Sequence, residues 1–119
     1  MLRCFLGAKL HRMVITEADL NYVGSITIDS DLLDISGILP GERVMVADIE
    51  SGARFETYVL EGKKGSGVIC INGAAARLVH TGDRAIILQY VWLDNTEAPP
   101  KPKVVMADSR NLNPSLLDI

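Results

Sequence analysis

The 119-residue sequence predicts a single domain of mainly β structure with short helices. Three observations support this fold class: the apolar runs are short, turn residues separate them at close intervals, and one turn motif occurs twice. Apolar residues make up 48% of the chain but aromatic residues only 5%, so valine, isoleucine, leucine and alanine must supply most of the core.

The first predicted strand covers residues 9–16, where side chains alternate between two faces. One face carries Lys9, His11, Met13 and Ile15, and the other carries Leu10, Arg12, Val14 and Thr16. Lys9 and His11 are therefore expected to lie close together on one face of the strand.

Turn and capping residues divide the middle of the chain into short elements. Asp29 can cap the start of a short helix, and Gly37 can end it. The other expected elements are a turn at 40–41, strands at 43–49 and 54–60 joined by a turn at 51–52, a mobile basic loop at 62–67, a strand at 68–71, a turn at 72–73 and a short helix at 74–78.

Residues 85–93 form the most apolar run, which predicts a strand at the centre of the sheet. After Asp94 the chain is rich in proline, which favours an extended linker. A short edge strand at 104–106 and a loose tail are expected to follow. We therefore expect a barrel domain at 1–93, and a Pro-rich linker, an edge strand and a tail at 94–119.

A turn motif occurs twice, as Gly41-Glu42-Arg43-Val44 and as Gly82-Asp83-Arg84-Ala85. Each copy follows an expected helix and precedes an expected strand. The repeat favours a small barrel with approximate twofold symmetry. Ordinary turn chemistry can produce the same pattern by chance, and the sequence alone leaves both explanations open.

Composition argues against several classes of function. The net charge is −3, whereas a nucleic-acid-binding domain needs a basic face. No apolar run approaches the ~20 residues of a membrane span, and charged residues interrupt the region where a secretory signal would be apolar. Cys4 and Cys70 are typical of free thiols in a reducing cytoplasm. The wide separation of His11 and His80 does not match zinc-ligand spacing, so no metal is expected.

Several polar residues occupy strand positions and are candidates for a binding site. Arg54 and Tyr58 share one face of a predicted strand, and Thr57 points to the other face. A cation on an apolar strand must reach solvent or meet an anion. Arg54 can instead pair with Glu56, and the Lys9 side chain can extend into solvent, so a structural explanation remains open.

The dipeptide Gly24-Ser25 interrupts two apolar segments, a context that permits backbone strain. The residues alone do not distinguish it from Gly65-Ser66, the second Gly-Ser pair of the chain.

Taken together, several segments resemble the bacterial aspartate 1-decarboxylases. The segments that carry the resemblance are Ala8–Arg12, Ala18–Ser25, Gly52–Tyr58, Gly65–Gly67 and Asn72–Ala76. The similarity covers roughly residues 1–93, with a weaker match at Pro102–Val104. It implies a double-psi β-barrel with short helices, assembled as a homotetramer in the cytoplasm, without nucleic-acid or membrane partners.

The resemblance also implies a self-processing enzyme that converts L-aspartate to β-alanine and carbon dioxide, for pantothenate and coenzyme A biosynthesis. Ser25 attacks the carbonyl of Gly24, and the chain is cut into residues 1–24 and 25–119. The cofactor is a pyruvoyl group derived from Ser25, with neither a metal nor pyridoxal phosphate.

The resemblance assigns roles to residues in three groups. Thr57 and Asn72 assist the cut between Gly24 and Ser25, and Tyr58 donates a proton during turnover. The substrate-binding residues are Lys9, His11, Arg54, Thr57, Gly73, Ala74 and Ala75. Lys9 and Arg54 suit a substrate with two carboxylates.

Two other functions remain open at this point. In one, the chain is a barrel that never cleaves and serves only as a binding or assembly module. Alternatively, it decarboxylates another amino acid, since glutamate differs from aspartate by one methylene, which is worth only ~1–3 kcal/mol of discrimination.

Overall fold

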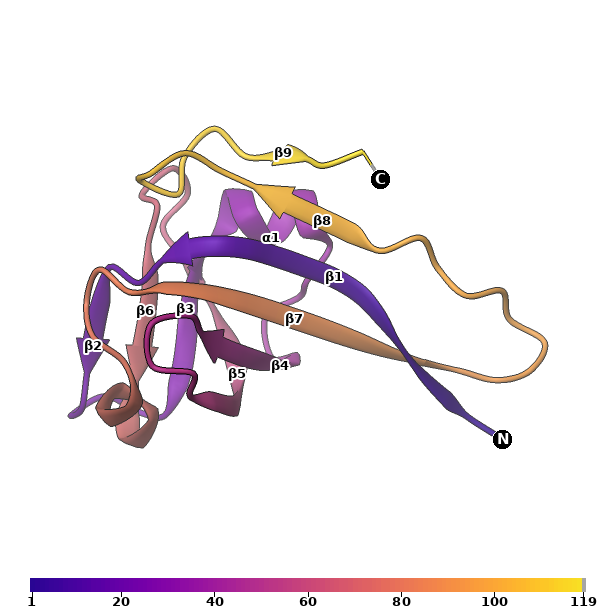
Figure 1. Ribbon diagram of the computed structural model, residues 1–119, viewed down its shortest axis with the longest axis horizontal. Coiled ribbons are helices and arrows are strands. Elements are labelled where there is room, and N and C mark those ends of the chain that lie inside the picture. The colour runs from indigo at the N-terminus through magenta and orange to yellow at the C-terminus, as the bar shows by residue number, and fades with distance from the viewer. Residues whose placement is uncertain (119) are drawn as a thin grey trace.

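The computed structural model describes residues 1–118 as one curved nine-stranded sheet with two short helices (Figure 1). The strands are β1 (Arg3–Val14), β2 (Glu17–Asp19), β3 (Ser25–Asp29), β4 (Arg43–Asp48), β5 (Arg54–Gly62), β6 (Ile69–Asn72), β7 (Arg84–Leu93), β8 (Lys103–Met106) and β9 (Ser115–Leu116). The helices are α1 (Ser30–Ser36) and the 3₁₀ helix η1 (Gly73–Leu78). The predicted fold class, mainly β with short helices, is confirmed.

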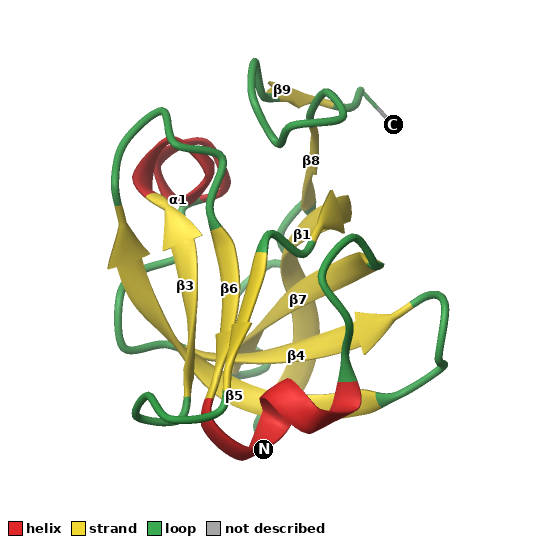
Figure 2. Cartoon of the chain, turned by 90° about the vertical axis from the view of Figure 1, so that its left-hand side faces the viewer, coloured by secondary structure: helices red, strands yellow, loops and turns green. Residues whose placement is uncertain are grey.

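The strands follow the order β2-β6-β3-β5-β4-β7-β1-β8-β9, and the connection between β1 and β2 closes this sheet into a barrel (Figure 2). Only Ile15 and Thr16 separate β1 from β2 in the chain, although β2 lies at the far end of the strand order. At this junction the Thr16 backbone N–H donates to the Ile69 carbonyl of β6 at 2.8 Å. The sheet must therefore curl until β6 meets the end of β1.

The strand pairings repeat about an approximate twofold axis. β3, α1 and β4 in the first half correspond to β6, η1 and β7 in the second half. β5 runs parallel to β3 and antiparallel to β4. In the second half, β2 runs parallel to β6, and β1 runs antiparallel to β7. β3 pairs antiparallel with β6, and β4 pairs antiparallel with β7, so each of these pairs maps onto itself. The duplication suggested by the repeated turn motif is therefore present in the structure.

The two copies of the turn motif also make the same hydrogen bonds. In each copy the glycine N–H donates to a backbone carbonyl of a segment that crosses the turn. The acidic side chain accepts from the backbone N–H three residues earlier. In the first copy, Gly41 N donates to Val59 O and Leu39 N donates to Glu42 Oε1, both at 2.8 Å. In the second copy, Gly82 N donates to Ile15 O at 2.8 Å and His80 N donates to Asp83 Oδ2 at 2.9 Å. Gly41 and Gly82 have φ of 88° and 96°, a region that favours glycine.

The core fills the barrel and comes mainly from β-branched residues and leucine. Its largest fully buried side chains are Leu10, Met13, Ile15, Ile26, Ile28, Leu32, Ile38, Ile69, Ile71, Ile87, Val44 and Val46. β7 pairs with both β1 and β4, which confirms its predicted central place. Within residues 1–118, no helix has the length and apolar character needed to cross a membrane.

The predicted alternation in the first strand is wrong beyond Leu10. β1 starts at Arg3, and its register with β7 shifts between Leu10 and Met13. Arg12 lies in this shift with φ of 56°, and its side chain is exposed. Such a β-bulge adds a residue and reverses the side-chain phase. Leu10 and Met13 are therefore both buried, although the alternation placed them on opposite faces.

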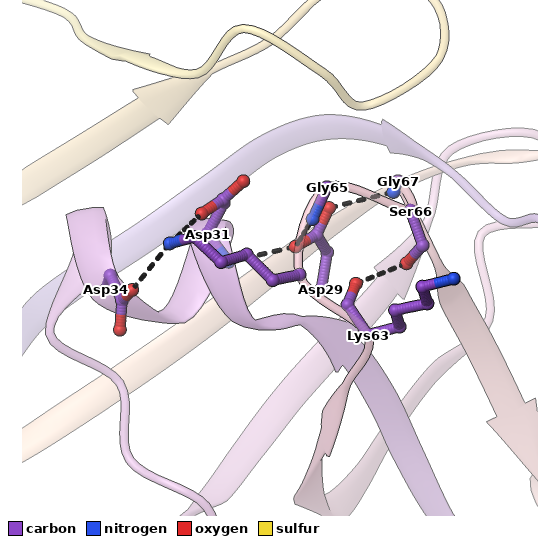
Figure 3. A network of polar contacts seen from close by, with 8 residues as sticks. Asp29, Asp31, Asp34, Lys63, Gly65, Ser66 and Gly67 are labelled. Atoms are coloured by element: carbon purple, nitrogen blue, oxygen red, sulfur yellow. Dashed lines mark hydrogen bonds and ion pairs between the residues drawn. The ribbon is translucent and has the colours of Figure 1, made fainter.

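The loop at residues 63–67, expected to be mobile, is anchored by the buried carboxylate of Asp29 (Figure 3). Asp29 Oδ1 accepts from the backbone N–H groups of Asp31 at 2.9 Å and Gly65 at 3.0 Å, and Oδ2 accepts from Gly67 at 2.8 Å. Lys64 Nζ also lies 2.7 Å from Asp31 Oδ1. One carboxylate thus caps α1 and holds the loop against it.

The expectation of a loose tail is wrong for residues 107–118. β8 pairs parallel with β1, and β9 covers the other edge of β8. Asn111 is buried, and its side chain accepts from Val14 N at 2.8 Å and donates to Val14 O at 2.8 Å and Gly67 O at 2.9 Å. This asparagine ties the tail to the end of β1 and to the loop before β6.

One polar contact differs between the two halves. At the first turn motif, Gln89 Nε2 of β7 donates to both carboxylate oxygens of Glu42, at 3.2 and 3.1 Å. Aligning the two turn motifs places Asp48 at the position of Gln89 and Asp83 at that of Glu42. Carboxylate oxygens of Asp48, Asp83 and the exposed Glu50 lie within 4.8 Å of one another.

Asp48 is buried, and its Oδ2 has no hydrogen-bond donor among the described residues. Burial raises the pKa of Asp48, and the neighbouring Asp83 carboxyl raises it further. The proximity of the Asp48 carboxyl lowers the pKa of Asp83. A proton retained on Asp48 would take the place of the amide N–H that Gln89 donates to Glu42.

The substitution Asp48→Asn is expected to stabilise the protein at neutral and alkaline pH. The folded state of the wild type retains a proton on Asp48 above the ordinary pKa of 3.8, so its stability falls as pH rises through this window. An asparagine supplies an N–H at every pH. Urea unfolding should show a gain of about 1 kcal/mol at pH 8 that disappears toward pH 4.

A matched control for this prediction is Asp34→Asn, because Asp34 is exposed. The control should change the free energy of unfolding by less than about 0.5 kcal/mol at both pH values. An Asp48→Asn variant with the same stability gain at pH 4 and pH 8 would contradict the shared proton.

Candidate active site

Gly24 and Ser25 lie where β3 begins, beside the end of β6. Ser25 pairs with Asn72 in the antiparallel register of these strands, and its side chain is fully buried. In contrast, Ser66 of the second Gly-Ser pair is exposed in the anchored loop. The structure therefore distinguishes the two Gly-Ser pairs, which the sequence alone does not.

The Ser25 hydroxyl has two hydrogen-bond partners. Its Oγ donates to the Val23 carbonyl at 3.0 Å and accepts from Asn72 Nδ2 at 2.9 Å. Asn72 Nδ2 also donates to Thr27 Oγ1 at 3.1 Å, and Cys70 Sγ donates to Asn72 Oδ1 at 3.1 Å. The predicted partnership of Ser25 and Asn72 is therefore present as a direct contact.

Thr27 and Cys70 were not predicted as site residues. Ser25 and Thr27 alternate along β3, as Cys70 and Asn72 alternate along β6, and the pairing places Thr27 opposite Cys70. The residues between them are fully buried in the core, so all four polar side chains lie on the face turned away from it. The sequence shows that Ser25 and Thr27 are two residues apart, as are Cys70 and Asn72. It does not show the register in which β3 pairs with β6.

Gly73 packs directly against the backbone of Gly24. Gly73 has φ of 74°, and a Cβ there would lie 2.6 Å from Gly24 Cα and 2.9 Å from Gly24 N. At Gly24 a Cβ would meet nothing within 4 Å in the described part of the chain. Gly24 is also not among the described glycines with positive φ. The tightly packed glycine of this site is therefore Gly73.

β5 brings Thr57 and Tyr58 alongside β3. The parallel register places Val59 opposite Ile26, and extending it backward places Tyr58 beside Ser25. Tyr58 is 39% exposed, whereas Thr57 is half-buried and points to the opposite face. Tyr58 thus shares the outward face with Ser25.

Lys9 and Arg54 lie on strands that are not neighbours in the sheet. Lys9 of β1 is opposite Leu88 of β7, and Arg54 of β5 is opposite Ala47 of β4. β7 and β4 therefore lie between the two cations, which corresponds to three strand spacings, or roughly 14 Å. Leu88 and Ala47 are equivalent in the two halves, so Lys9 and Arg54 occupy symmetry-related positions.

Arg54 is exposed and makes no ion pair within residues 1–118. Glu56, its alternative partner in the sequence interpretation, instead lies near Arg43, with 3.6 Å between Oε2 and Nε. The Arg54 guanidinium is therefore available to an external carboxylate.

His11 is half-buried, and its Nδ1 is buried without a hydrogen-bond partner among the described residues. Burial lowers the pKa of His11, and the nearby charges of Lys9 and Arg12 lower it further. The imidazole is therefore neutral near pH 7 and can accept a hydrogen bond. The contribution of Lys9 agrees with the predicted closeness of these two side chains.

Ala74 and Ala75 follow Gly73 in the first turn of η1. Ala74 is exposed and Ala75 is half-buried. Asn72 precedes this helix, but its side chain does not cap it, because the amide is used by Ser25 and Thr27. The structure thus groups Gly24, Ser25, Asn72 and Gly73, with Thr57 and Tyr58 on the neighbouring strand.

Comparison with known proteins shows the family of this chain. The family model described as aspartate decarboxylase matches residues 1–113, which extends beyond the expected barrel domain. Proteins named aspartate 1-decarboxylase are similar along most of their length. The one from Neisseria meningitidis is 58% identical over 112 residues, covering 93% of this chain and 88% of the relative. The one from Porphyromonas gingivalis is 58% identical over 105 residues, covering 87% of this chain and 89% of the relative. The one from Bacillus subtilis is 54% identical over 112 residues, covering 93% of this chain and 88% of the relative. The chain belongs to the aspartate decarboxylase family, and its duplicated, mainly β barrel agrees with the double-psi β-barrel expected of that family.

Proposed function

We propose that this chain cuts itself between Gly24 and Ser25 and then converts L-aspartate to β-alanine and carbon dioxide, for pantothenate and coenzyme A biosynthesis. The observation that carries this proposal is the buried Ser25 hydroxyl, held by Asn72 and Val23 directly after Gly24. The relatives named aspartate 1-decarboxylase support aspartate as the substrate.

The cut begins when Ser25 Oγ attacks the carbonyl carbon of Gly24. The Gly24–Ser25 peptide C–N bond breaks, an ester forms at Oγ, and the amine of Ser25 is released. The hydrogen bond to Val23 O directs the Ser25 O–H bond, while the Asn72 N–H positions Oγ. Thr57, one strand away, is the proposed hydroxyl that supports the Gly24 carbonyl oxygen.

Elimination then separates the two chains. The Cα proton of Ser25 is removed, the Cβ–Oγ bond breaks, and Gly24 leaves as a carboxylate that retains Oγ. The N–H of Asn72 stabilises the negative charge that develops on this oxygen. Water hydrolyses the remaining Ser25-derived residue, ammonia leaves, and a pyruvoyl group remains at the new N-terminus.

The residues around Ser25 fit this group, because Tyr58 lies on the same outward face of the neighbouring strand. When present, the pyruvoyl group supplies a carbonyl that condenses with the substrate amine and accepts the electron pair left by carbon dioxide. Arg54 provides a planar donor pair for one substrate carboxylate, and Lys9 provides a point charge. Tyr58 donates the proton that replaces carbon dioxide.

The separation of Lys9 and Arg54 supports assembly of several copies, and we propose a homotetramer in the cytoplasm. In such an assembly, cations of one copy can lie beside Ser25 of another. A groove of about 370 Å³ on the outer face contains Met45, Tyr90 and Trp92, of which Tyr90 and Trp92 are 42% and 57% exposed. This exposed apolar surface on the projecting end of β7 suits contact with a second copy (Figure 1).

Intact mass spectrometry is expected to show two chains, residues 1–24 and 25–119, in the incubated wild type. The larger chain should react with a carbonyl reagent, and the sample should release carbon dioxide from aspartate. Ser25→Ala should remain one chain, since it lacks the attacking oxygen, whereas the control Ser66→Ala should cleave normally. A wild type that stays intact and inactive would instead support the binding-module alternative.

Gly73→Ala is expected to slow self-cleavage at least ~100-fold, because the new Cβ displaces Gly24, whose carbonyl must be attacked. The matched control is Gly82→Ala, where φ is 96° but a Cβ has open space in the described structure. Both substitutions should cost roughly 1–2 kcal/mol of unfolding free energy from positive φ. Equal cleavage rates in the two variants, measured by gel densitometry, would refute the role of close packing.

Tyr58→Phe is expected to cleave normally and yet lose activity, because only turnover needs the phenolic proton. The initial rate of β-alanine formation should fall by about 10²–10⁴-fold. Tyr90→Phe, with a similarly exposed side chain, is the control and should keep its activity. Full activity in Tyr58→Phe would assign the proton donor to another residue.

A further inference from the structure

The Ser25 and Thr27 hydroxyls do not by themselves determine the orientation of the Asn72 amide. A hydroxyl can donate or accept, so either Nδ2 or Oδ1 of Asn72 can face a hydroxyl. In the structure Nδ2 faces both hydroxyls, at 2.9 and 3.1 Å. The group that distinguishes the two orientations must therefore contact the other end of the amide.

That group is the thiol of Cys70. Cys70 lies two residues before Asn72 on the same face of β6, and its Sγ is 3.1 Å from Asn72 Oδ1. An S–H group donates to a carbonyl oxygen but is a poor acceptor for an amide N–H. We propose that Cys70 is a positioning residue for self-cleavage, whose S–H holds Asn72 Oδ1 and thereby directs the Asn72 N–H toward Ser25 Oγ. This inference rests on the function proposed above.

The surroundings keep this thiol protonated. Cys70 is 6% exposed, and burial, the charges of Glu17 and Asp19, and the closeness of the Glu17 carboxylate as an acceptor raise the pKa of its thiol to about 11. The S–H donor is therefore present at neutral pH. Cys4, the other cysteine, is exposed and has no place in this network.

The orientation matters because the same oxygen plays two roles. Ser25 Oγ first attacks Gly24 and later leaves with it as part of a carboxylate. An N–H directed at this oxygen stabilises the charge that develops as it leaves. With the amide reversed, Asn72 Oδ1 would face the same oxygen and repel that charge.

The other half of the barrel supports a specialised role for this pair. The residue equivalent to Asn72 is Asp29, the last residue of the matching strand. Asp29 only accepts hydrogen bonds, and its partners are backbone N–H groups of α1 and the anchored loop. A side-chain donor at this position is thus specific to the half that faces Ser25.

The test compares self-cleavage rates of Cys70→Ala, Cys70→Ser and Cys4→Ala in the full chain, starting from freshly purified precursor. Cys70→Ala loses the donor and should cleave about 5–10-fold more slowly, the effect of one hydrogen bond. Cys70→Ser keeps a donor and should cleave within about twofold of the wild type, as should Cys4→Ala. Thermal unfolding midpoints measured on the same samples report any loss of packing.

A simple packing role predicts a different result. In that case Cys70→Ser, which buries an extra polar group, would be at least as slow as Cys70→Ala, and that order would overturn the inference. A wild-type rate in Cys70→Ala would also overturn it. If the wild type itself does not cleave, the proposed function fails, which separates this outcome from failure of the Cys70 inference alone.

Discussion

The antiparallel register between β3 and β6 is the constraint on which the rest of this structure depends. Thr27 lies opposite Cys70, and this pairing places Ser25 opposite Asn72. Because side chains alternate along a strand, a slip of one residue would send the polar residues into the core. The fully buried isoleucines on the other face, Ile26 and Ile71 among them, therefore help to determine where the Ser25 hydroxyl lies.

The two halves use the same backbone for different purposes. At the end of β3, Asp29 satisfies backbone N–H groups and stabilises the fold. At the end of β6, the equivalent Asn72 leaves its helix uncapped and contacts Ser25 instead. Similarly, the Gln89 amide donates to the acid of one turn motif, whereas the acid of the other lies beside Asp48, whose pKa is raised. The duplicated barrel provides stability in one half and tolerates unusual polar contacts in the other.

Much of the fold was predictable because its signals are local. Turn residues and alternation located the strands around 43–49, 54–60 and 85–93 to within a few residues. The errors came from long-range contacts or local irregularity. The anchored loop depends on Asp29, the ordered tail depends on Asn111, and the shifted face of β1 depends on the bulge at Arg12. None of these has a signature within its own segment.

The candidate site was less accessible to local reasoning. Gly24-Ser25 had no feature of its own that separated it from Gly65-Ser66, and only the combined resemblance of several segments selected it. Residue types suggested Lys9 and Arg54, but not their separation by two intervening strands. The contributions of Thr27, Cys70 and the close packing of Gly73 require the strand register, which the sequence does not display.

The position of β1 has a consequence for the protein after cleavage. Residues 1–24 contain all of β1, which pairs with β7 on one side and β8 on the other. If the chain is cut as proposed, the mature enzyme is a non-covalent complex of two fragments, and the short fragment contains Lys9 and His11. Since β1 also contributes Leu10 and Met13 to the core, its dissociation would open the barrel. Fragment exchange and dilution thus become routes of inactivation that the uncut precursor does not have.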